Sequence, residues 1–176
     1  HKAEEECNQS MSQSRNDFEE ALRVYALGIE KHFLGILFHY REVNELVYKK
    51  ILTKLDVQLD RVENGAVQIQ SLDEAFSLDW FEQIAQKTEN LLLRRKHVDD
   101  EIKEQYMYYR AQEVIARKVL KEFAKMKLLS DIDREEYQEL IERVMLSYQS
   151  FRDDAHSRME RIVSENVALL SSLDEV

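Results

Sequence analysis

The sequence predicts an all-α fold: an antiparallel bundle of four or five long helices, with a C-terminal helix of coiled-coil character. The 176 residues include no proline and only three glycines, the residues that tight turns of sheet proteins require. Hydrophobic residues make up 44% of the chain and charged residues 34%, enough for a core beneath a charged surface. Apolar residues also recur at three- and four-residue steps along most of the sequence, which is the helical period.

The same periodicity places the first two helices. Residues 1–13 are polar and are expected to form a mobile lead-in, and residues 14–176 are expected to form a single helical domain. The first helix should run from the start of this domain to Tyr40. Asn44 is a suitable N-cap for a second helix that ends at Asn64, where a glycine follows as a C-terminal signal.

Cap signals also place the later helices. Ser71 starts a capping-box spacing, so residues 72–127 should form either one very long helix or two helices with a kink. Asp133 is expected to cap the last helix. Apolar residues of that helix alternate steps of four and three, which is a heptad seam: Tyr137, Ile141, Val144, Tyr148, Phe151, Ala155, Ile162 and Leu169. Segments 18–64 and 105–151 share one organisation, and are either a two-hairpin repeat or two ordinary helical hairpins.

Charge and composition exclude several classes of function. Acidic residues number 35 against 25 basic ones, a formal net charge of −10 that argues against nucleic acid as a partner. No apolar run approaches the length of a membrane span. Cys7 is the only cysteine, so no intramolecular disulfide is possible and a cytoplasmic location is expected. Because the sequence begins at His1 in helix-like sequence, we expect it to be a piece of a longer polypeptide.

No constellation for catalysis, metal or cofactor binding stands out. A di-iron bundle needs Glu-x-x-His on two helices, and none of the five histidines has a Glu three residues before it. Asp153 precedes His156 at that spacing, but once only. The three glycines are not clustered as a phosphate-binding loop requires. We therefore expect a protein that is not an enzyme and that needs no cofactor or metal.

The most informative local feature is a row of small residues in the first helix. Ala21, Gly28 and Gly35 are seven residues apart and therefore lie on one side of the helix. A glycine inside a helix costs about 1 kcal/mol relative to alanine, so the two glycines call for an explanation. Two explanations stay open: ordinary close packing within the chain, or a self-association surface where a helix of another subunit approaches.

Two histidines form the neighbouring row. His32 and His39 are also seven residues apart, and either sense pH at a packed seam or are simply half-exposed. If they border a dimer contact, protonation would bring four positive charges together. Association should then weaken as the pH falls through about 6.5, the ordinary histidine pKa, unless a carboxylate such as Glu42 compensates.

Three stretches of the sequence resemble a known family. They are ALRVYALGIEKHFL (21–34), VYKKILTKLDVQLDRVE (47–63) and YRAQEVIARKVLKEF (109–123). They resemble the cytoplasmic C-terminal region of bacterial sodium/proton antiporters of the monovalent cation:proton antiporter family. The likeness extends over residues 20–65 and 105–150.

The resemblance implies a soluble regulatory or assembly domain of a cation/proton antiporter that is not catalytic by itself. It further implies a homodimer attached to an upstream transmembrane transporter domain of the same polypeptide, at the cytoplasmic face of the inner membrane. The family's ion-binding carboxylates lie in membrane helices, so no transport residue is assigned in this chain. The alternative is a free-standing cytoplasmic helical adaptor or coiled-coil interaction protein.

Overall fold

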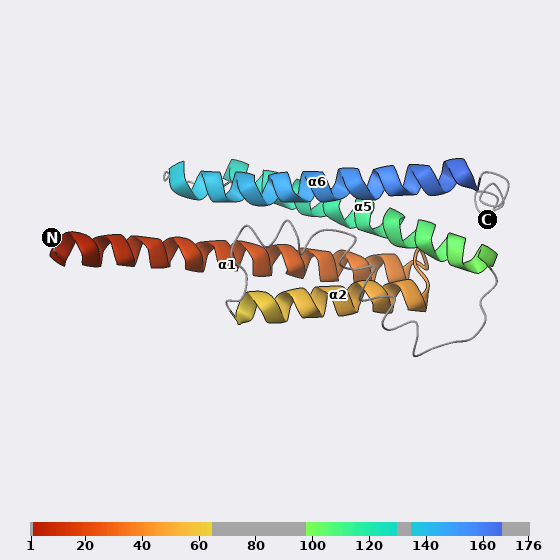
Figure 1. The fold of residues 1–176 in the computed structure, drawn as a ribbon, viewed down its shortest axis with the longest axis horizontal. Coiled ribbons are helices and arrows are strands. Elements are labelled where there is room, and N and C mark those ends of the chain that lie inside the picture. The colour runs from red at the N-terminus through yellow and green to blue at the C-terminus, as the bar shows by residue number, and fades with distance from the viewer. Residues whose placement is uncertain (1, 65–97, 130–134, 167–176) are drawn as a thin grey trace.

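The structure is a computed structural model that describes residues 2–64, 98–129 and 135–166. Four helices make up this part of the chain: α1 (Lys2–His39), α2 (Glu45–Glu63), α5 (Val98–Leu129) and α6 (Glu135–Glu165). Helices α1 and α2 are antiparallel, and so are α5 and α6. Helices α1 and α6 therefore run one way, and α2 and α5 run the other (Figure 1). The described ranges contain no strand, and the predicted all-α antiparallel bundle is confirmed.

Helix α1 begins earlier than the sequence predicted. Its helical backbone starts at Lys2, whereas the predicted start was residue 14. The first turns, residues 2–13, contain no glycine or proline and include three Glu and two Gln, which favour helix even without an apolar stripe. These N-terminal turns extend beyond the ends of the other three helices (Figure 1).

The turn between α1 and α2 follows the predicted boundaries. Arg41 adopts the left-handed conformation with φ 59°, and the N–H of Glu42 donates to the carbonyl of Leu37 at 2.9 Å, which closes the end of α1. Asn44 then caps α2, because its side chain accepts a hydrogen bond from the N–H of Val47 at 2.9 Å. The predicted connection and N-cap are confirmed.

Several sequence predictions fall outside the described residues. The caps at Ser71 and Asp133 lie there, and so does the first part of the stretch 72–127. From Val98 to Leu129 the helix is continuous.

The core consists of two hydrophobic clusters that share α1 and α5. One joins α1, α5 and α6, and the predicted seam of α6 supplies its buried side chains Ile141, Tyr148, Phe151 and Ile162. The other joins α1, α2 and α5, and includes Leu34, Val47, Ile51, Leu55 and Ile115. Helix α1 is thus packed against neighbours on two sides. Among the helices that the structure describes, none combines the length and apolar character needed to cross a membrane.

Candidate functional site

The predicted small-residue row lies on the side of α1 that points away from both cores. We define the α1 outer face as Ala21, Val24, Tyr25, Gly28, His32, Gly35 and His39. All of these are exposed except Gly35, which is half-buried. Two large apolar side chains of this face remain open to solvent, with Val24 38% and Tyr25 48% exposed. Leu22, Ala26 and Leu34, which are buried, occupy the opposite side of the helix.

The two glycines of the α1 outer face meet no other helix of the described chain. A Cβ atom built on Gly28 or Gly35 would have no described atom within 4 Å beyond its chain neighbours and the backbone of α1 itself. Close packing between helices of the described chain therefore does not account for either glycine. The predicted role in self-association concerns a second chain and stays a prediction.

The two histidines are both exposed on this face. The ring of His32 lies 5.3 Å from that of Phe33, and the ring of His39 lies 5.2 Å from that of Tyr40. Glu42, the carboxylate expected to compensate their charge, instead pairs with Arg110 of α5 at 3.4 Å. His32 and His39 therefore lie on one face of α1, but Glu42 does not serve as a carboxylate partner for either of them.

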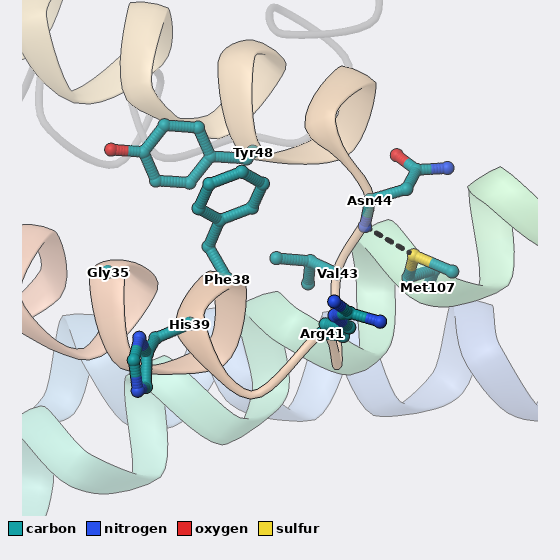
Figure 2. A pocket seen from close by; sticks show the side chains of 8 residues that line it. All are labelled: Gly35, Phe38, His39, Arg41, Val43, Asn44, Tyr48 and Met107. Atoms are coloured by element: carbon teal, nitrogen blue, oxygen red, sulfur yellow. Dashed lines mark hydrogen bonds between the residues drawn. The ribbon is translucent and has the colours of Figure 1, made fainter.

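An open cleft adjoins the α1 outer face at the turn between α1 and α2 (Figure 2). It has a volume of about 780 Å³. Its wall includes the stacked rings of Phe38 and Tyr48, whose centroids are 4.4 Å apart. The backbone N–H of Asn44 lies 3.1 Å from Sδ of Met107 and ties the turn to α5. The full lining is Gly35, Phe38, His39, Arg41, Val43, Asn44, Tyr48 and Met107.

The sequence analysis missed a buried polar cluster to which all four described helices contribute. Tyr148 of α6 donates a short hydrogen bond to Glu30 of α1. The ammonium of Lys54 in α2 donates to Gln112 Oε1 of α5 at 2.9 Å, and lies 4.2 Å from the ring centre of Phe151. Glu30, Lys54 and Gln112 are 1%, 4% and 0% exposed, so the cluster is closed to solvent.

Burial dominates the ionisation of this cluster. It raises the pKa of Glu30, although the charge of Lys54 and the hydrogen bond from Tyr148 act in the opposite direction. It lowers the pKa of Lys54 to about 8, against the attraction of Glu30. The pKa of Tyr148 is raised well above its ordinary value, first by burial and then by the neighbouring carboxylate. The charged forms of Glu30 and Lys54 therefore lower the free energy of unfolding, because each charge is less favourable in the core than in water.

A second buried amide, after that of Gln112, also lowers the stability of the fold. Both polar atoms of the Gln58 side chain are buried and make no hydrogen bond with the described residues. The sequence did hold a signal for the cluster, because Lys54 stands between Ile51 and Leu55 on the apolar side of α2, where a lysine is unexpected. Glu30 likewise stands between Leu27 and Leu34 in α1.

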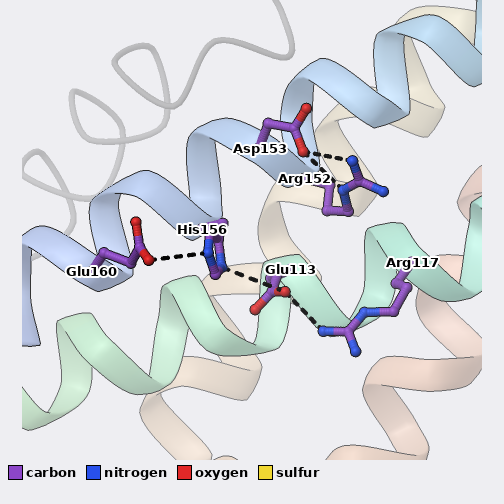
Figure 3. A network of polar contacts seen from close by, with 6 residues as sticks. All are labelled: Glu113, Arg117, Arg152, Asp153, His156 and Glu160. Atoms are coloured by element: carbon purple, nitrogen blue, oxygen red, sulfur yellow. Dashed lines mark hydrogen bonds and ion pairs between the residues drawn. The ribbon is translucent and has the colours of Figure 1, made fainter.

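Helices α5 and α6 carry a polar network on their surface (Figure 3). Glu113 pairs with Arg117 at 2.8 Å and lies 3.7 Å from Nδ1 of His156, whose Nε2 is 3.3 Å from Glu160. Asp153, which stands three residues before His156, pairs with Arg152 at 2.6 Å instead. Exposed pairs of this kind add little to stability, and we interpret them as a solvated helix surface.

No metal centre emerges from the described ranges, where no three His, Cys, Asp or Glu side chains gather as ligands. Comparison with known proteins finds no matching family model, no similar curated protein and no similar solved structure. Function must therefore be inferred from the α1 outer face, the adjoining cleft and the closed polar cluster.

Proposed function

We propose that this chain is an interaction module that binds a partner through the α1 outer face and the cleft beside it. The observation that carries the proposal is the exposure of apolar side chains along one side of a helix that is otherwise held by two cores. Val24, Tyr25 and Phe38 are 38%, 48% and 40% exposed. Neighbouring exposed apolar side chains of this size are typical of binding surfaces.

The polar groups of the molecule support binding rather than catalysis. Three groups with shifted pKa values, Glu30, Lys54 and Tyr148, are enclosed among four helices and cannot meet a substrate. The lowered pKa of exposed Glu45 comes from its ion pair with Lys49. The open cleft is lined mainly by apolar side chains, with Arg41 and His39 as its ionisable groups. Such a cleft fits an apolar or amphipathic segment of a protein.

In a finer form of the proposal, the module is the cytoplasmic regulatory or assembly region of a sodium (cation)/proton antiporter. The membrane part would then belong to the same polypeptide. Support comes from the resemblance over residues 20–65 and 105–150, whose described parts belong to the helix pairs α1–α2 and α5–α6. The module would change transport by binding, because the transported ion is handled in the membrane part.

The second candidate is a free-standing helical adaptor. It is favoured by the N-terminal turns of α1, which extend beyond the other helices as a helix does when it pairs with another molecule (Figure 1). Both candidates use α1 for recognition. They differ in whether a transporter is part of the same polypeptide.

The complete gene and one pair of variants test these alternatives. In the antiporter form, the gene encodes membrane helices before this segment, and everted vesicles show sodium-driven proton movement. Gly28→Leu should then change the rate or the pH dependence of exchange, whereas Ser150→Leu on the exposed side of α6 should not. A gene without membrane helices would overturn the antiporter form and leave the adaptor. If both variants match wild type in exchange and in binding of co-purified proteins, the interaction face is wrong.

A further inference from the structure

We propose that the occupant of the α1 outer face is α1 of a second copy of this chain, antiparallel, with Gly28 at the two-fold axis. This rests on the proposed function and names the partner of that same face. The chain would form an isologous dimer, the commonest symmetric assembly.

The first ground is the symmetry of the face about Gly28. Ala21 and Gly35 lie seven residues before and after it. In an antiparallel pair centred on Gly28, this glycine meets its own copy, and Ala21 lies level with Gly35 of the partner subunit. Three contacts of small residues then allow the two helices to approach closely. That approach explains two glycines that no packing within the described chain explains.

The second ground is the distribution of charge along α1. Exposed Asp17 and Glu20 precede the small residues, and His39 and Arg41 follow them, both exposed as well. An antiparallel pair places Asp17 level with His39 of the partner subunit, whereas a parallel pair would bring like charges together. Complementary charges of this kind determine the relative orientation of the two α1 helices more than the affinity of the dimer.

The same register uses the extended start of α1. Its N-terminal turns would run past the α1–α2 turn of the partner subunit. The helix beyond the bundle in Figure 1 would thereby lie against a neighbour instead of standing alone.

The third ground is the placement of the exposed apolar side chains. Tyr25 borders the glycine row on one side, and Val24 borders it on the other. A two-fold axis then puts the Tyr25 side of one helix next to the Tyr25 side of its partner, and the Val24 side next to the Val24 side. Tyr25 then lies within one residue of the level of His32 of the partner subunit. The contact from Asp17 to His39 runs about 33 Å along α1, long enough to cover the exposed part of both side chains.

Cysteine cross-linking of the 176-residue chain tests the orientation. With Cys7→Ser as background, Gly28→Cys should form a disulfide-linked dimer readily under mild oxidation. Gly35→Cys alone should not, because the two positions lie about 21 Å apart along the antiparallel pair. A mixture of Ala21→Cys and Gly35→Cys chains should cross-link. Ser150→Cys, exposed on α6, is the control for random collision.

Sedimentation tests the face itself. Gly28→Leu should raise the dissociation constant of the dimer about tenfold or more, because it forces two leucines into a close contact. Ser150→Leu should leave it unchanged, and circular dichroism should show both variants folded. A monomeric wild type at millimolar concentration, rapid self-cross-linking of Gly35→Cys, or a dimer indifferent to Gly28→Leu would each overturn the proposal.

The two proposals fail separately. A monomeric chain whose Gly28→Leu variant still alters exchange or binding would refute the dimer and keep the interaction face, which then takes another occupant. A dimer as described whose variants leave exchange and binding unchanged would refute the proposed function and keep the assembly.

Discussion

The buried pair of Glu30 and Lys54 predicts a minimum in relative stability between the pKa values of the two groups. The perturbation is the double variant Glu30→Gln with Lys54→Met, which removes both charges at similar volume. Gln at position 30 keeps an oxygen that can accept from Tyr148, whereas Met at position 54 leaves Gln112 Oε1 without its donor. That loss changes the stability difference by a constant amount, so the prediction concerns only how the difference varies with pH.

The lysine gives the alkaline side of the minimum. Burial lowers the pKa of Lys54 from its usual 10.5 to about 8, so between these values the unfolded chain binds more protons than the folded one. The free energy of unfolding of the wild type then rises with pH relative to the variant. At about 1.4 kcal/mol per pH unit, the wild type gains about 2 kcal/mol between pH 8 and about pH 9.5. Tyr148 stays neutral in this range because its pKa is raised.

The glutamate gives the acid side. The pKa of Glu30 is raised by burial, so just above its usual value of 4.5 the folded chain binds more protons than the unfolded one. The relative stability of the wild type is therefore greatest in acid and is lost as the pH rises through the raised pKa. Together the two groups leave the wild type weakest, relative to the variant, between the raised pKa of Glu30 and the pKa of about 8 of Lys54.

Urea unfolding followed by circular dichroism at a series of pH values measures this difference. The matched control is Glu45→Gln with Lys49→Met, which removes an exposed pair of the same residue types from α2. Its difference from wild type should vary little with pH. A difference for the buried pair that is flat between pH 7 and pH 9.5, or that moves against the wild type above pH 8, would refute the burial of these charges.

Three further variants test local features by urea unfolding of dilute protein. Gly28→Ala should raise the free energy of unfolding by about 1 kcal/mol, since the added Cβ meets no neighbour; a loss would mean that the site is packed. Asn44→Ala should lower it by about 1 kcal/mol through loss of the α2 cap, and an unchanged value would contradict the hydrogen bond to the Val47 N–H. Arg41→Gly should raise it by about 1 kcal/mol by relieving the left-handed conformation, and a decrease would contradict the positive φ of this residue.

The fold was largely predictable because helix boundaries depend on local signals. Asn44 caps α2 as predicted, and the chain turns between α1 and α2 without glycine or proline. The start of α1 was not predicted, because its first turns lack an apolar stripe in the sequence and only their helix propensity pointed to a helix. Propensity without periodicity is easily mistaken for a frayed end.

The buried polar cluster was harder to predict, for an energetic reason. A sequence shows that Lys54 interrupts an apolar stripe, but a lysine can reach solvent from the edge of such a stripe. Burial of its ammonium depends on Gln112 and Phe151, which lie 58 and 97 positions further along the chain. Only the packing of α2 against α5, together with the reach of the Lys54 side chain to Phe151 of α6, brings these groups together.

The outward orientation of the α1 outer face could not be predicted from the sequence of α1 alone, because it depends on which other helices pack against the opposite side. Seven-residue spacing places Ala21, Gly28 and Gly35 on one side of α1, but buried glycines and exposed glycines give the same spacing. The distinction comes from the partners of the opposite side, where Leu34 packs toward α2 and Glu30 accepts from Tyr148 of α6. Because α1 is held from both directions, its glycine side must point outward. The same contacts hold that side in a fixed orientation, which lowers the entropic cost of binding another helix there.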